Sequence, residues 1–136
     1  MGKIWYEGEW RNGERAGQGK EYSTGELIYE GAWKGGKREG QGKEYYSGWD
    51  DTQTLVYEGD WKNGKYHGHG KLYRYDGSLL YEGKFENGLY NGHGIEYNPD
   101  GTVKYEGDFV YVTPDRSIQS EEDNNTTTSN FWNDSW

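Results

Sequence analysis

The chain has 136 residues and no cysteine, which excludes a disulfide framework and a zinc site built on thiolates. Its formal net charge is −9, and binding to a phosphate backbone requires clustered lysine and arginine, so we expect no nucleic acid partner. No apolar run approaches the roughly 18 residues of a transmembrane helix, and the start shows no apolar secretory segment. The sequence therefore predicts a cytoplasmic protein, with attachment to the cytoskeleton or to a membrane left open.

Five copies of Tyr-Glu-Gly divide the chain into repeating units. They begin at Tyr6, Tyr29, Tyr57, Tyr81 and Tyr105. A period in the twenties is typical of a repeat array, in which each unit stacks on its neighbours instead of around one central core. We expect an array over residues 1–110, with units 6–28, 29–56, 57–80 and 81–104 and a partial unit 105–109.

The first unit predicts a β-hairpin. Tyr6, Gly8 and Trp10 alternate with charged residues, and this period of two indicates a strand with one covered face. The Asn12-Gly13 pair predicts a tight turn, because both residues tolerate positive φ. A second short strand follows over residues 17–22, starting at a Gly-x-Gly, and a further glycine-containing turn leads into the next unit.

The later units repeat this pattern, so the predicted fold class is all-β, an elongated single sheet of antiparallel β-hairpins. Two strands per full unit and one from the partial unit give about nine strands and a length of roughly 40 Å. Aromatic residues make up 18% of the chain, so we expect stacked rings to form the core. The sequence leaves open whether the Gly-x-Gly glycines lie under the rings or on the opposite face.

The repeated pattern Tyr-x-Gly-x-Trp-x-x-Gly followed by Gly-x-Gly closely resembles the MORN repeat (membrane occupation and recognition nexus). The resemblance covers residues 5–109, and Phe85 and Phe109 replace the tryptophan with another aromatic ring. It implies a hairpin array that binds proteins or, in some members, anionic phospholipids. Such arrays are often joined to catalytic domains, and we recognise none in this sequence.

Residues 111–136 differ in composition from the array. Residues 111–114 either finish the last strand or cap the array, and Pro114 forbids a central strand there. The acidic, polar sequence that follows predicts a disordered tail. Its last residues include three large aromatic side chains, which we consider as a docking motif or as a segment that folds back on the sheet; they are Phe131, Trp132 and Trp136.

The chain shows no convincing catalytic or metal-binding constellation, so we expect no enzymatic activity, no cofactor and no bound metal. His67 and His69 share a strand face, but His69 and His93 stand where the first two units carry Gln18 and Gln41. This favours a row of polar side chains over a metal site. The glutamate of each Tyr-Glu-Gly also recurs, and a row of equivalent carboxylates balanced by lysines indicates a solvated face.

Recognition of a protein partner is the favoured function. We expect a small adaptor whose exposed aromatic groove holds a helix or an extended segment. Within the units, residues that do not repeat are the best contact candidates. Matching the Asn-Gly turns places Tyr66 and Tyr90 where the first units have Arg15 and Arg38, and an inserted loop carries Trp49.

Two other associations stay open. Lys37 and Arg38 belong to the densest basic group, Lys34, Lys37, Arg38 and Lys43, which is the candidate contact with anionic phospholipid. Surrounding carboxylates would cancel much of that attraction, so lipid binding is the alternative function. The open edges of the predicted sheet also favour self-association, because unpaired strand edges readily pair with another chain.

Overall fold

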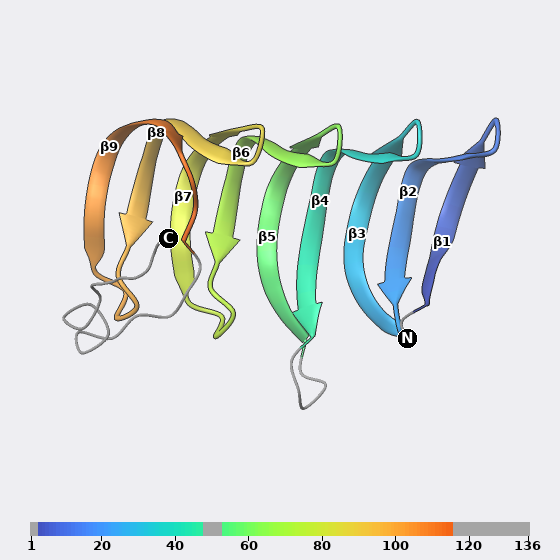
Figure 1. Cartoon of the computed structure of the whole chain (residues 1–136), viewed down its shortest axis with the longest axis horizontal. Helices are drawn as coiled ribbons and strands as arrows, with labels where there is room; N and C mark the ends of the chain where they lie inside the picture. Colours follow the sequence, from blue (N-terminus) through green and yellow to red (C-terminus); the bar gives the residue numbers. More distant parts are fainter. Residues whose placement is uncertain (1–2, 48–52, 116–136) are drawn as a thin grey trace, which may run out of the picture.

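The computed structural model describes residues 3–47 and 53–115, and the described chain forms one open sheet. Nine strands lie side by side in chain order, each antiparallel to its neighbours (Figure 1). They are β1 (Ile4–Arg11), β2 (Glu14–Ser23), β3 (Glu26–Lys34), β4 (Lys37–Ser47), β5 (Gln53–Lys62), β6 (Lys65–Tyr73), β7 (Leu79–Glu86), β8 (Leu89–Tyr97) and β9 (Val103–Val112). The predicted fold class is confirmed. Residues 3–47 and 53–115 contain no helix, and hence none able to cross a bilayer.

The hairpin turns explain why each unit doubles back. Asn12 and Gly13 have φ of 52° and 81°, and Asn63 and Gly64 have 53° and 81°. Two successive positive φ values match the right-handed twist of the flanking strands, and asparagine and glycine tolerate them best. These hairpin tips lie along one long edge of the sheet, at the top of Figure 1, and the turns that connect successive units lie along the other.

A line of glycines crosses the sheet, one from each strand. It consists of Gly8, Gly19, Gly31, Gly42, Gly59, Gly70, Gly83, Gly94 and Gly107, each paired with the next. A Cβ on Gly19 would overlap the ring of Tyr6, and a Cβ on Gly42 would overlap Tyr29. The tyrosine rings therefore lie directly on this glycine ladder, which answers the question that the sequence left open.

The first glycine of each Gly-x-Gly has a different role. Gly17, Gly40, Gly68 and Gly92 have φ between 59° and 107°. The pairing register of every hairpin shifts at this point, as where Gly8 pairs with Gly19 but Glu9 pairs with Ala16. A bulge of this kind requires a left-handed residue, and glycine adopts that conformation without strain.

The core is a zigzag of aromatic rings on one face, which we call the aromatic face. Tyr29 meets Trp33 of its own unit edge-to-face at 5.1 Å between ring centroids, and Trp61 of the next unit at 5.2 Å. The same alternation runs from Tyr6 to Phe109. Edge-to-face pairs contribute about 0.5–1.5 kcal/mol each beyond the area that they bury. The expected core of stacked rings is confirmed.

Hydrogen bonds fix the rings in place. Each repeat tyrosine donates its hydroxyl to the carbonyl three residues later, as from Tyr29 to Ala32 at 2.9 Å and from Tyr81 to Lys84 at 2.9 Å. The indole of Trp33 donates to the carbonyl of Gly19 at 3.1 Å. These bonds satisfy the hydroxyl groups of the repeat tyrosines and the indole group of Trp33, and they set the tilt of each ring against the sheet.

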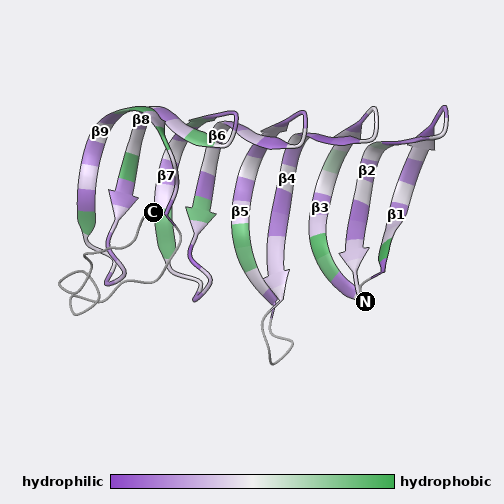
Figure 2. Ribbon diagram, viewed as in Figure 1, coloured by the Kyte–Doolittle hydropathy of each residue, from purple (hydrophilic) through white to green (hydrophobic). Residues whose placement is uncertain are grey.

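A small aliphatic cluster supplements the rings. Figure 2 shows strongly hydrophobic stretches at the lower ends of β3, β5 and β7, beside the connecting turns. Val56 and Leu80 lie there, directly before the repeat tyrosines of β5 and β7, and are each 2% exposed. Arg74 closes the neighbouring turn, donating to the carbonyls of Leu79 and Tyr97 at 3.2 and 2.7 Å. The aliphatic residues thus seal the lower edge of the aromatic core.

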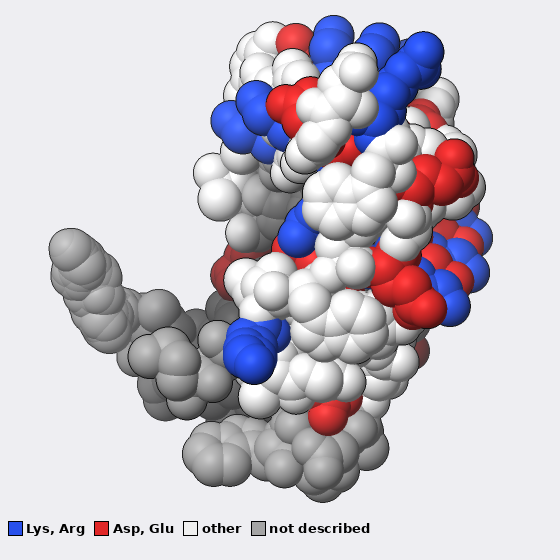
Figure 3. All heavy atoms as spheres, turned by 90° about the vertical axis from the view of Figure 1, so that its right-hand side faces the viewer, with Lys and Arg blue, Asp and Glu red and all other residues white. Residues whose placement is uncertain are grey.

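The opposite face, the polar face, carries a ladder of alternating charge. Glu7 lies opposite Lys20, which lies opposite Glu30, and the alternation continues through Lys43, Glu58, Lys71 and Glu82. Figure 3 shows that the molecule is curved, with acidic and basic groups interspersed on its convex side. The expected solvated glutamate row, balanced by lysines, is confirmed.

The last strand bends back over the sheet end. Tyr111 has φ of 47°, and its amide donates to the side chain of Asn91 at 3.2 Å. After this bend Val112 lies opposite Tyr90 of β8. Of the two alternatives for residues 111–114, Tyr111 and Val112 therefore finish the last strand. The predicted disordered tail lies outside the described residues beyond 115.

Candidate interaction surface

One position on the aromatic face changes its chemistry along the array while keeping its place. Arg15, Arg38, Tyr66 and Tyr90 lie opposite Trp10, Trp33, Trp61 and Phe85 in their hairpins. The equivalence of these four residues, inferred by matching the turns, is thus confirmed. We call this place the covering position.

Each residue at the covering position lays a flat group over the repeat tyrosine of its own unit. The guanidinium of Arg38 lies 4.5 Å from the ring centroid of Tyr29. The ring of Tyr66 stacks on Tyr57 at 4.0 Å with an interplanar angle of 10°. An exposed cation–π contact contributes about 0.5–1 kcal/mol, similar to a stacked aromatic pair. Guanidinium and phenol are therefore interchangeable for packing.

The same flat groups also join neighbouring units. Arg15 lies 4.9 Å from the ring of Trp33, and Tyr66 lies 5.6 Å from Phe85, in each case the aromatic residue of the following unit. Each covering residue therefore bridges two units. Its loss would weaken a unit and also the interface that holds the array together.

A second position on this face lies beside the covering position and also changes its chemistry along the array. It holds Glu21, Glu44, Leu72 and Glu96. Arg38 bridges the first two carboxylates, at 2.9 Å to Glu21 and 3.5 Å to Glu44. Tyr66 donates its hydroxyl to Glu44 at 2.5 Å, so the covering residue of one unit binds the glutamate of the unit before it.

The pairing changes in the last full unit. In the unit before Tyr90, the second position holds Leu72 instead of a glutamate. The exposed fractions of Tyr90 and Leu72 are 1% and 0%. The first half of the aromatic face is therefore lined by arginines and carboxylates. In the second half, stacked tyrosines replace the arginines, and Leu72 replaces one of the glutamates. The side chains of Arg15 and Arg38 keep 23% and 17% of their surface exposed.

The expectation of an openly exposed aromatic groove is wrong for the interior of the array. Tyr29 and Tyr57 are 0% exposed, and Trp33 is 5% exposed. Guanidinium and phenol groups cover these rings, so an incoming partner meets the covering residues and not the aromatic core. The sequence hides this because it does not show which side chains lie over which rings.

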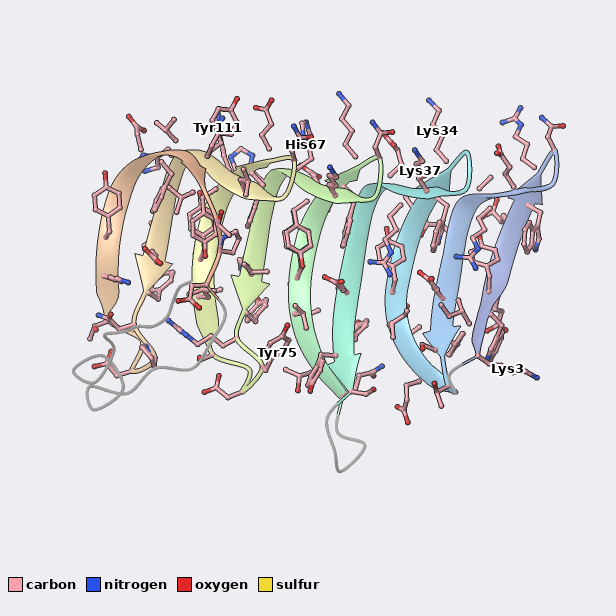
Figure 4. All side chains as sticks on the ribbon, in the orientation of Figure 1. Lys3, Lys34, Lys37, His67, Tyr75 and Tyr111 are labelled. Carbon is pink, nitrogen blue, oxygen red and sulfur yellow. The ribbon has the colours of Figure 1, made fainter. Side chains whose placement is uncertain are left out.

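The predicted contact residues separate in space. Arg15, Arg38 and Tyr66 gather on the aromatic face, where Tyr66 is half-buried, whereas Tyr90 is fully packed. Lys37 lies at a hairpin tip (Figure 4). Trp49, Phe131, Trp132 and Trp136 lie outside the described residues.

The basic group that sequence proximity suggested is dispersed. Arg38 is ion-paired on the aromatic face, and Lys43 lies 3.9 Å from Glu58 on the polar face. Lys34 and Lys37 remain together at the second hairpin tip. A different cationic row, which the sequence reading missed, includes Arg11, Lys62 and Lys65 at neighbouring tips. Aligning the residues on either side of each turn reveals it.

The ends of the array differ from its interior. Trp10 is 60% exposed while the equivalent Trp33 is 5% exposed, because no strand lies beyond β1 among the described residues. Tyr105 in β9 is 47% exposed for the same reason. Both ends therefore present an unpaired strand edge with exposed rings, and self-association through these edges stays a proposal.

The titratable groups of the described chain form no cluster of metal ligands, and the clearest pKa shifts belong to buried tyrosines. No group of three or more potential ligands that could hold a metal ion occurs within residues 3–47 and 53–115. Burial raises the pKa of Tyr81 to about 12, and it also raises the pKa of Tyr29 and of Tyr57. These phenols stay protonated at neutral pH and act as hydrogen-bond donors.

The fold and this surface define an open-sheet repeat protein with a variable covering layer. A model of the MORN repeat matches four consecutive segments, residues 6–26, 29–50, 57–79 and 81–103. The chain belongs to the MORN repeat family, whose repeats typically serve as modules for protein or membrane interaction. A search of curated proteins finds no match to this chain.

Proposed function

We propose that this chain is a non-catalytic adaptor or scaffold that holds a segment of a protein partner against its aromatic face. The observation that carries the proposal is the covering position, which holds Arg15, Arg38, Tyr66 and Tyr90 in equivalent places. Packing requires a flat group there and accepts either chemistry. Packing therefore leaves the charge at the covering position free to vary, and this charge can serve to recognise a partner.

The composition of the covering layer supports a protein partner. Arginine and tyrosine are enriched at binding hot spots, because each combines a large flat surface with directional hydrogen bonds. Arg15 and Arg38 are held in place by Glu21, at 3.5 and 2.9 Å, so little side-chain freedom is lost on binding. A helix or an extended segment would suit such a preorganised surface. This role fits a cytoplasmic assembly on the cytoskeleton or a membrane.

The test is affinity capture from a host lysate with the full chain and a variant that keeps the packing but removes the charge. Arg15→Tyr/Arg38→Tyr copies the tyrosines of the later units, and Lys20→Gln/Lys71→Gln on the polar face is the matched control. We expect a stoichiometric partner that the wild type and control retain and the tyrosine variant loses. Capture of the same partner by the folded tyrosine variant would place recognition elsewhere.

A third variant in the same experiment tests the terminal aromatic residues. Phe131→Ser/Trp132→Ser/Trp136→Ser should retain the partner if the aromatic face carries recognition. Loss of the partner with this variant alone would assign recognition to the tail. If no protein is captured by any form, the adaptor function is rejected, and binding to phosphatidylserine vesicles tests the lipid alternative.

A further inference from the structure

Five cationic side chains form a row along the hairpin tips, which we call the basic edge. They are Arg11, Lys34, Lys37, Lys62 and Lys65. All five are exposed, and Lys34 and Lys37 lie beside the second hairpin tip in Figure 4. Figure 3 shows lysine and arginine gathered at this edge of the molecule. The basic edge spans the tips of the first three hairpins.

The fold does not require this concentration of charge. Lys34 lies directly opposite Lys37, and Lys62 lies directly opposite Lys65. Like charges opposite one another destabilise a strand pair. The equivalent positions in the fourth hairpin hold Glu86 and Leu89, so a tip of this geometry forms without lysine. Two successive like-charged pairs are therefore unfavourable for the isolated chain.

None of the five cations forms an ion pair within the described residues, although Glu14 lies directly opposite Arg11 in the first hairpin. Within residues 3–47 and 53–115, no carboxylate oxygen lies within 4.0 Å of any of their charged nitrogens. By contrast, Arg15, Arg38 and Lys43 on the two faces of the sheet are ion-paired. In a chain of net charge −9, this edge is a segregated basic surface that attracts anionic groups.

The basic edge adjoins the proposed binding face. A hollow of about 410 Å³ lies between the first two tips, and its lining joins Arg11 and Lys34 to Trp33 of the aromatic face. Successive tips are two strands apart, about 10 Å. Seven residues of an α-helix also rise about 10 Å. A helix laid across the strands would thus meet one tip with every seventh residue.

We propose that the basic edge binds an acidic flank of a helical protein segment, with an Asp or Glu about every seven residues. The proposal rests on the function proposed above, because the remainder of the same helix lies on the aromatic face. It names the chemistry of the partner: an apolar stripe beside a regularly spaced acidic row.

Features of the edge favour a shaped protein partner over a flat anionic membrane. Glu14 and Glu39 line the hollow among the cations. The carboxylate of Glu39 also accepts the amide of Asn63 at 3.1 Å, so it is fixed in the row. A protein can place its own cations beside these two carboxylates. An anionic membrane surface would be repelled by the carboxylates and by the net charge of −9.

Two helical peptides of equal length and equal apolar stripe test the proposal with the full chain. The first carries glutamate at every seventh position of one flank, and the second carries glutamine there. Binding is measured by fluorescence anisotropy against the wild type, Lys34→Gln/Lys37→Gln/Lys62→Gln/Lys65→Gln, and a control with the same charge change, Lys3→Gln/Lys20→Gln/Lys71→Gln/Lys84→Gln. We expect the acidic peptide to bind the wild type and control at least about tenfold more tightly than the edge variant.

Each other outcome overturns the proposal in a recognisable way. Equal binding of both peptides to the wild type would reject the basic edge and leave the aromatic face as the binding surface. Failure of both peptides would reject the helical partner, while the capture experiment decides separately whether the adaptor function stands. If phosphatidylserine vesicles, and not the acidic peptide, lose binding in the edge variant, the edge contacts lipid instead.

Discussion

The first and second halves of the array solve the same packing problem with different chemistry. In the first half, Arg15 and Arg38 cover the repeat tyrosines and are ion-paired to glutamates. In the second half, Tyr66 and Tyr90 stack on the equivalent rings at 4.0 and 3.8 Å. The glycine ladder and the ring zigzag beneath are the same in both halves.

This comparison separates what the fold requires from what it leaves free. The ladder glycines and the repeat tyrosines cannot change, because the rings lie directly on glycine backbone. The covering position must hold a flat group, but its charge and its hydrogen-bonding partner differ between halves. The charge of the aromatic face can therefore change along the array while every unit keeps the same backbone geometry.

The largest expected effect comes from the part that both halves share. Gly42→Ala and Gly70→Ala each place a Cβ against the ring of a repeat tyrosine, in the first and second half respectively. We expect each to lower the free energy of unfolding by about 3 kcal/mol. Urea denaturation followed by tryptophan fluorescence measures this loss.

The control for these glycine substitutions is Gly64→Ala. Gly64 has φ of 81° but open space around its Cα, so alanine there meets backbone strain only. We expect a loss of about 1 kcal/mol. A loss at Gly64 equal to that at Gly70 would contradict the close contact between ring and backbone.

An effect of similar size distinguishes the two covering tyrosines, Tyr66 and Tyr90. Tyr90 is 1% exposed, and Tyr90→Ala should cost about 3 kcal/mol, near the lower end for loss of a buried aromatic side chain. Tyr66→Ala should cost less, about 2 kcal/mol, because its ring remains half-exposed. Thermal unfolding by circular dichroism compares the two. A larger loss at position 66 would reverse the assigned order of burial.

Removing a charged covering residue should have a smaller effect that depends on salt. Arg38→Ala deletes the cation–π contacts with Tyr29 and Trp61 and leaves Glu44 without its arginine. Glu21 loses one of its two arginines and keeps the other. We expect a loss of about 2 kcal/mol at low ionic strength and less in 1 M salt. The loss from Tyr66→Ala should not decrease with salt. Equal salt dependence would remove the chemical distinction between the halves.

A further effect appears only at alkaline pH. Burial raises the pKa of Tyr81 to about 12, above the ordinary value near 10. The folded state therefore favours the neutral phenol, and this contribution to stability is complete below pH 10 and is lost as the pH rises towards 12. Tyr81→Phe should lose less stability than the wild type between pH 10 and 12. The exposed Tyr111→Phe is the control and should follow the wild type.

Much of the fold could be predicted, because the same hairpin pattern occurs several times in the chain and each copy supports the same prediction. The Tyr-Glu-Gly copies gave the strand order, and the Asn63-Gly64 type of turn gave the hairpin geometry. The face of the glycines could not be predicted. It depends on a bulge at the first glycine of each Gly-x-Gly, which shifts the register by an amount that the sequence pattern does not specify.

The candidate surface was only partly predictable. Matching the turns identified Arg15, Arg38, Tyr66 and Tyr90 as equivalent, which the strand pairing confirms. Their contacts with rings and glutamates depend on side-chain direction across three strands. Sequence proximity also joined Arg38 to Lys37, although Lys37 lies at the hairpin tip and Arg38 is ion-paired on the aromatic face.

The most direct test of the account is the free energy of unfolding of two double variants. Arg15→Tyr/Arg38→Tyr should remain within about 1 kcal/mol of the wild type, because it places a flat phenol at each covering position, as the later units do. Arg15→Ala/Arg38→Ala should be about 3 kcal/mol less stable, because the rings of both units lose their cover. If the tyrosine variant is destabilised as much as the alanine variant, the covering position requires charge, and the central claim is contradicted.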